Sequence, residues 1–238
     1  MIKRAFQRLS AFASCGFLIA VLLGLTTGEA LGQSSAWAFP TRNLFVGELQ
    51  NFYSSGGAKQ HMGGCYGLGY PGWDRYSCNF TGGAIWITNE NFTDTTGTEH
   101  SQHIAQLGFR FNGVGEMFPQ KLELVGRYER PVVTVDGTQS FMWPIQNDRV
   151  DSNMKGASKV VTVTNTHTGI TLTRTIRAFS NEYHDNYHIV EYELTNTGEI
   201  NEGRAEVPDQ TLEKVHLGFS DLNEVNQQGM SMLGWGSG

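Results

Sequence analysis

One segment, 170–179, constrains the fold of this chain more than any other. Its sequence is ITLTRTIRAF, in which residues of one parity are mostly apolar and residues of the other are mostly threonine. The apolar set is Ile170, Leu172, Ile176 and Ala178, and the polar set is Thr171, Thr173, Thr175 and Arg177. A period of two places successive side chains on opposite faces of a strand, and no helix shows it over ten residues. A row of threonines suits the wet side of an antiparallel sheet, so the segment predicts a half-buried strand.

The rest of the chain is also typical of strands joined by tight turns. Valine, isoleucine, threonine and aromatic residues dominate the apolar runs, and the 29 glycines lie mostly between them. No window after residue 32 holds the apolar spacing of an amphipathic helix for three turns. We therefore predict an all-β fold, an antiparallel β-sandwich with long loops. The expected strands are 43–49, 83–89, 105–111, 121–125, 132–135, 160–164, 170–179, 187–195 and 215–219, and the expected loops are 88–103 and 144–156.

The first 32 residues have the pattern of a cleaved secretory signal. Lys3, Arg4 and Arg8 precede an apolar run at 11–25, and small residues follow at 30 and 32. The alternative is a retained anchor, but the run is shorter than the roughly 20 residues that span a bilayer. We expect residues 1–32 to be a signal peptide and residues 33–238 to be a secreted β-sandwich region. No later segment is long and apolar enough to predict a membrane span.

The charge of the secreted region argues against nucleic-acid binding. Three of the 17 basic residues and one of the 23 acidic residues leave with the signal, so 14 and 22 remain and the net charge is −8. No basic cluster survives, and contacts with phosphate supply most of the affinity of nucleic-acid-binding proteins.

Two cysteines and several aromatic residues mark the segment 65–78. Cys65 and Cys78 flank a glycine-rich stretch, and an oxidising compartment favours their pairing. A loop of this size closed by a disulfide gains about 3 kcal/mol of stability in the chain-entropy model. Free buried thiols are the alternative. Exposed aromatic residues on a rigid loop make platforms for sugar rings or partner proteins, whereas buried ones would form a satellite core. The candidate platform is Tyr66, Tyr70, Trp73 and Tyr76.

The segment 182–198 concentrates histidines and acids, and we interpret it as turn, strand and turn. His184 and His188 would lie about 13 Å apart on an extended chain, so a metal site there needs a bend at Asp185 and a third ligand. Glu191 and Glu193 share a face at a spacing that glycoside hydrolases use. They alternate with apolar residues, however, which predicts the wet side of a strand that pairs with Arg174 or Arg177.

Two further clusters fall in the expected loops. His100 and His103 have a spacing that can bind metal, but the local sequence supplies no completing ligands. Asp148, Asp151 and Asn153 resemble part of a calcium loop without the EF-hand spacing, and they leave a structural calcium open as the one candidate cofactor. No catalytic motif with a recognisable nucleophile and base is present.

Several runs resemble segments of large, poorly characterised secreted bacterial proteins. They are VVTVDG (132–137), GITLTRTIRAFSNEYHDNYHIVEYELTNTGEI (169–200), VPDQTL (207–212), TRNLFVGELQNFYSSGG (41–57) and GGAIWI (82–87). The resemblance implies an N-terminal β-rich region followed by fibronectin-type modules and a C-terminal sorting domain. It carries no catalytic set. Because those modules are missing here, we expect the sequence to be the front part of a longer protein.

The sequence thus favours a secreted, non-enzymatic extracellular or cell-surface module with a structural or adhesive role. Its expected partners are downstream domains of the same chain or cell-surface components. The alternative is a carbohydrate-binding or carbohydrate-active domain that uses the aromatic loop 65–78.

Overall fold

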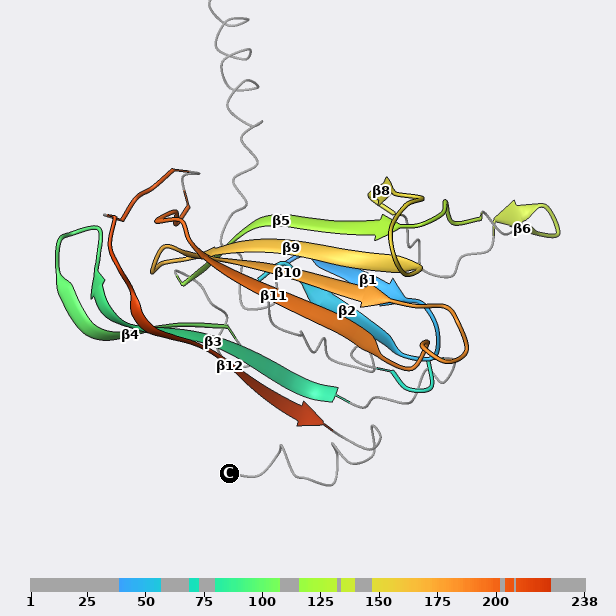
Figure 1. The fold of residues 1–238 in the computed structure, drawn as a ribbon. Coiled ribbons are helices and arrows are strands. Elements are labelled where there is room, and N and C mark those ends of the chain that lie inside the picture. Colours follow the sequence, from blue (N-terminus) through green and yellow to red (C-terminus); the bar gives the residue numbers. More distant parts are fainter. Residues whose placement is uncertain are drawn as a thin grey trace, which may run out of the picture. The chain divides into compact units, whose positions relative to one another are not determined.

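The computed structural model describes residues 39–56, 69–72, 80–107, 116–131, 134–139, 147–201, 204–207 and 209–223. All of them belong to one compact unit, Ser35–Gly238. These residues form strands and no helix, and the prediction of an all-β fold is confirmed (Figure 1). Within them, no helical segment could cross a membrane. The strands are β1 (Thr41–Phe45), β2 (Gln50–Ser54), β3 (Phe80–Thr93), β4 (Glu99–Leu107), β5 (Met117–Gly126), β6 (Thr134–Val135), β7 (Thr138–Gln139), β8 (Arg149–Val150), β9 (Ser158–Thr166), β10 (Ile170–Ala178), β11 (His188–Asn196) and β12 (Glu213–Asn223).

A five-stranded sheet in the order β11-β10-β9-β5-β8 carries most of the core. Its long strands pair antiparallel, and only the short β8 is parallel to its neighbour. The alternation in β10 is confirmed, because Ile170, Leu172 and Ile176 are buried while Thr173 and Thr175 on the opposite face are partly exposed. A turn at 167–169 joins β9 to β10, and irregular backbone at 197–198, where Gly198 takes a φ of +71°, follows β11.

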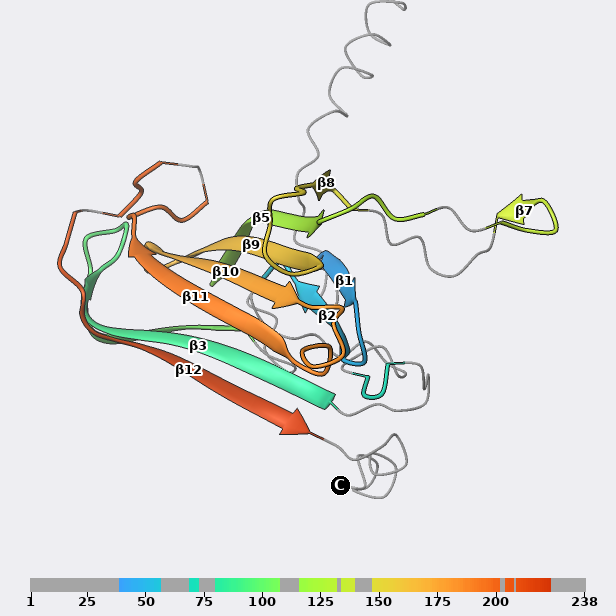
Figure 2. The same ribbon diagram turned by 45° about the vertical axis from the view of Figure 1, so that its right-hand side comes forward.

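A three-stranded sheet in the order β12-β3-β4 packs on one half of that buried face. Ile85 and Ile87 of β3 share a core cluster with Ile170 and Leu172 of β10. The ring of Tyr192 on β11 also lies 4.9 Å from that of Phe219 on β12. Two antiparallel sheets therefore pack through their apolar faces, as in a β-sandwich. Figure 2 shows β12 running alongside β3 in the smaller sheet.

The β1–β2 hairpin covers the other half of the same face. Leu44 and Tyr53 of the hairpin cluster with Val160 of β9 and with Ile176 and Ala178 of β10. The apolar row of β10 therefore meets the three-stranded sheet at one end and the hairpin at the other. Turns between the elements fix this placement, since Glu48 and Leu49 both donate backbone hydrogen bonds to the carbonyl of Asp185.

Arg174 lies in the middle of that apolar row and is 1% exposed. Its Nη2 donates a hydrogen bond to the carbonyl of Ser54 at 2.6 Å, and its guanidinium lies 5.5 Å from the centre of the Tyr53 ring. Nearby, Thr164 of β9 donates its hydroxyl to the carbonyl of Ser55 at 2.6 Å. The larger sheet thus supplies hydrogen-bond donors to the backbone carbonyls at the end of the hairpin. Apolar side chains could not satisfy those carbonyls.

The expectation of a loop at 88–103 is wrong. Residues 80–93 and 99–107 form a long hairpin, and only 94–98 turn. Oδ1 of Asp94 accepts hydrogen bonds from the backbone N–H groups of Thr96 and Thr98, and Gly97 takes a φ of +84°. The polar composition of this segment reflects strands with a wet outer face. The expected strand 43–49 is also corrected, because it ends at Phe45 and β2 begins at Gln50.

Replacing Arg174 with alanine is expected to destabilise the protein by about 3 kcal/mol. The change leaves the Ser54 carbonyl without its donor and a cavity among packed side chains. Arg177→Ala is the matched control, because this arginine lies on the wet face and pairs with exposed Glu191. Its loss should cost less than about 1 kcal/mol. Urea unfolding followed by circular dichroism measures both, and equal losses would contradict this role of Arg174.

Candidate functional site

The face of the three-stranded sheet that points away from the core is the strongest candidate site. Ile85 and Ile87 of β3 point inward. The residues that alternate with them, Ala84, Trp86, Thr88 and Glu90, therefore point outward. The pairing register brings Thr88 of β3 beside His216 of β12 and Ile104 of β4. One step along, Trp86 lies between Gly218 and Gln106. This outer face therefore combines an indole, hydroxyl, imidazole and amide groups, and an exposed aliphatic side chain.

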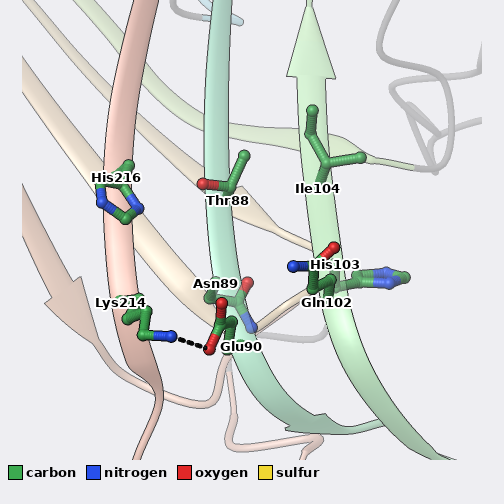
Figure 3. A pocket seen from close by; sticks show the side chains of 8 residues that line it. All are labelled: Thr88, Asn89, Glu90, Gln102, His103, Ile104, Lys214 and His216. Atoms are coloured by element: carbon green, nitrogen blue, oxygen red, sulfur yellow. Dashed lines mark ion pairs between the residues drawn. The ribbon is translucent and has the colours of Figure 1, made fainter.

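A hollow of about 450 Å³ opens on the outer face (Figure 3). Side chains from all three strands line it: Thr88 and Glu90 of β3, Gln102 and Ile104 of β4, and Lys214 and His216 of β12. Asn89 and His103 also border it, although their side chains belong to the opposite face of the sheet. Polar groups from three neighbouring strands thus surround a depression in the outer face.

Gly218 shapes the end of the outer face where Trp86 lies. A Cβ atom at this glycine would be only 3.3 Å from Cε3 of the indole. The lack of a side chain lets the indole lie close to β12 instead of standing away from the sheet. Trp86 precedes Thr88 by two positions on the same face, which is about 6–7 Å along a strand. The indole therefore lies on the same face as the hollow, next to Thr88 in its lining, but is not itself one of the lining residues.

Glu90 and Lys214 set the charge of the hollow. Their carboxylate and ammonium groups are 2.8 Å apart. The hydrogen bond from Lys214 holds the pKa of Glu90 below its ordinary value, and the same contact raises the pKa of Lys214. Both groups therefore stay charged at neutral pH. A carboxylate in this state is a fixed hydrogen-bond acceptor, whereas a general acid needs a raised pKa.

The structure separates His184 from His188. Nδ1 of His184 contacts the hydroxyl of Tyr187, whereas His188 uses Nε2 toward the carbonyl of Leu49 and Nδ1 toward the hydroxyl of Tyr53. His188 faces the hairpin, because residues of its parity on β11 lie on the covered side of the sheet. Among the described residues, no three or more His, Cys, Asp or Glu side chains are grouped so that they could hold a metal ion.

The acidic candidates have structural partners. Arg177 donates to Glu191 across β10 and β11 at 2.6 Å, as predicted, whereas Arg174 faces the core. Asp148 accepts two hydrogen bonds from Arg42 and one from the backbone N–H of Leu124. The bond from Arg42 lowers the pKa of Asp148. Asp151 accepts from the backbone N–H of Asn153. This segment ties β1 to β5 and is not arranged around a common centre.

His100 and His103 do not lie in a loop but on β4, and they take different partners. Nε2 of His100 is 3.0 Å from Oδ2 of Asp94, whereas Nε2 of His103 is 2.5 Å from Nε2 of His167. The His103–His167 contact joins residues 64 positions apart, so nothing in the local sequence pattern indicated it.

Most of the predicted aromatic platform lies outside the described residues. This holds for Tyr66, Trp73 and Tyr76 and for both cysteines of the predicted disulfide, Cys65 and Cys78. Tyr70 is described and is 43% exposed. It follows Gly69, which forms an isolated bridge with Gln50 of β2.

Comparisons with protein-family models, with curated proteins and with solved structures found no match to this chain.

Filling the space above Gly218 is expected to displace the Trp86 indole. In Gly218→Val the new side chain would meet Cε3, so the indole N–H signal of Trp86 should shift in a ¹⁵N–¹H NMR spectrum. Ser220→Val is the matched control, because it lies on the same face of β12 but pairs with Ala84. An unchanged Trp86 signal in Gly218→Val would show that the indole does not lie against this glycine.

Proposed function

We propose that this chain is a non-enzymatic extracellular adhesion module that binds saccharide chains on the outer face of its three-stranded sheet. The observation that carries the proposal is that Trp86 lies on the same face of the sheet as an open hollow lined by polar side chains from three strands. The C–H groups of a pyranose ring pack on an indole, while its hydroxyl groups need donors and acceptors close by. The outer face offers both.

The state of the ionisable groups favours binding over catalysis. Glu90 is paired with Lys214 and its pKa is lowered, so its carboxylate is ionised at neutral pH. In this form it can accept hydrogen bonds from hydroxyl groups but cannot act as a general acid. Lys214 and Gln102 add donors on either side of β3. A shallow hollow along a sheet also suits a long chain ligand, which can extend past the site in both directions.

The proposed function keeps the extracellular location that the N-terminal signal pattern predicts, but the saccharide site is on the outer face of the three-stranded sheet and not on the loop 65–78. The sequence pointed to the aromatic loop 65–78, whereas the outer face was not recognised because residues 88–103 were expected to form a loop. The resemblance to N-terminal regions of secreted bacterial proteins stays a prediction, and it agrees with a module that attaches later domains to a glycan-bearing surface.

Trp86→Ala is expected to reduce glycan binding by about 5- to 150-fold, because the stacking of a base on an aromatic side chain contributes about 1–3 kcal/mol by alanine substitution and a stacked sugar ring should contribute on the same order. Binding of the full chain to a glycan array identifies a ligand, and titration calorimetry with that ligand gives the affinity of each variant.

Two controls separate the alternatives. Tyr128→Ala removes an aromatic residue that is 68% exposed and lies after β5, and it should leave binding unchanged. Trp73→Ala tests the aromatic loop. Loss of binding in Trp73→Ala alone would move the site to that loop, and a chain that binds no glycan at all would leave only the structural role.

A further inference from the structure

Two histidines from different sheets meet at the inner edge of β4. His103 belongs to β4 and His167 to the turn between β9 and β10. Their Nε2 atoms are 2.5 Å apart, and their rings lie edge to face with centroids 4.5 Å apart. The nitrogen atoms by which imidazole binds metals therefore converge on one point. Both residues are only half-buried, so ions from solvent can reach them.

The tautomer of His167 suits a ligand. Its Nδ1 lies 3.3 Å from the carbonyl oxygen of Glu116, which also accepts the backbone N–H of His167 at 3.0 Å. A carbonyl oxygen only accepts, so Nδ1 carries the proton and Nε2 presents a lone pair toward His103. A backbone carbonyl that holds the far nitrogen in this way is the usual outer partner of a metal-binding histidine.

Aromatic packing restricts the orientation of the His103 ring. Phe92 is buried and stacks on His103 with ring centroids 5.1 Å apart. The His103 ring is therefore held in place beside His167.

Asn89 gives an independent indication of a ligand. It pairs with His103 in the register of β3 and β4, so the two side chains share the inner face, and it is 2% exposed. Neither its Oδ1 nor its Nδ2 has a hydrogen-bond partner among the described residues. A buried amide with no partner is costly and rare, and a nearby ion or its bound water would satisfy it.

We propose that Nε2 of His103 and Nε2 of His167 bind a late first-row transition-metal ion, Cu²⁺ or Zn²⁺, with Asn89 and solvent completing its surroundings. Two nitrogens bound to a tetrahedral Zn²⁺ at 2.0–2.1 Å are about 3.3 Å apart, so the ion fits after a small rotation of one ring. His100 is turned to Asp94 and is not a ligand. Asn89 and His103 also border the outer hollow, but their side chains belong to the inner face, so the metal site does not use the side chains proposed to contact saccharide.

Metal titrations of the full chain test the proposal. Calorimetry should detect binding of Cu²⁺, with weaker binding of Ni²⁺ and Zn²⁺, as the intrinsic order for imidazole sites requires. His167→Gln should weaken the binding of Cu²⁺ by more than about tenfold, which is the least that loss of even an outer partner costs. Asn89→Leu should weaken it by about tenfold while the fold is retained. His216→Gln, on the outer face, is the matched control and should bind as the unchanged chain does.

A measurement on the unchanged chain covers the case in which His167→Gln fails to fold. Substoichiometric Cu²⁺ should broaden the imidazole C–H NMR signals of His103 and His167 before those of other histidines. The proposal is overturned if these two signals are not the first to broaden, or if His167→Gln folds and binds as before. An equal loss in His216→Gln would also overturn it. The contact would then be a plain N–H···N hydrogen bond between the sheets.

Discussion

The arrangement of the described strands depends on one buried cation. Arg174 occupies the centre of the apolar row of β10, at a position whose neighbours in the row are hydrophobic, and it reaches the carbonyl of Ser54 at the end of the β1–β2 hairpin. A hairpin that packs against the face of a sheet buries carbonyl groups at its end that no neighbouring strand pairs. Arg174 and Thr164 supply the donors, so the hairpin can cover the sheet without leaving those groups unsatisfied.

This constraint also divides the covered face of the larger sheet into two parts. Ile170 and Leu172 pack against β3, and Ile176 and Ala178 pack against β1 and β2. Burial of Arg174 favours its neutral form and lowers its pKa, while Tyr53 and Tyr192 on either side favour the charge. The hairpin and the smaller sheet therefore meet the larger sheet on either side of one charged group, and its hydrogen bond fixes the position of the hairpin.

The sequence predicted the strands whose two faces differ in polarity and missed those with polar residues on both faces. β10 and β11 were predicted within one residue of their observed ends, because apolar and polar residues alternate along them. Most of β4, up to His103, was expected to be a loop, since its outward Gln102 and its inward His103 are both polar. The inward polarity is explained by Asn89 and His167, which are distant in sequence. Arg174 was missed for the same reason, because its partner lies 120 residues away.

The irregularity in β12 shows why the outer face could not be predicted from alternation alone. The register shifts between Glu213 and His216, and Lys214 takes a φ of +47° that few non-glycine residues adopt. Bulges of this kind redirect side chains next to functional sites. Here the shift lets Lys214 reach Glu90, while His216 and Gly218 stay on the outward parity beside Thr88 and Trp86. In a regular strand a one-residue change of register would exchange the inward and outward sets. The bulge therefore allows both a salt-bridged hollow and an apolar inner face to form on the same three strands.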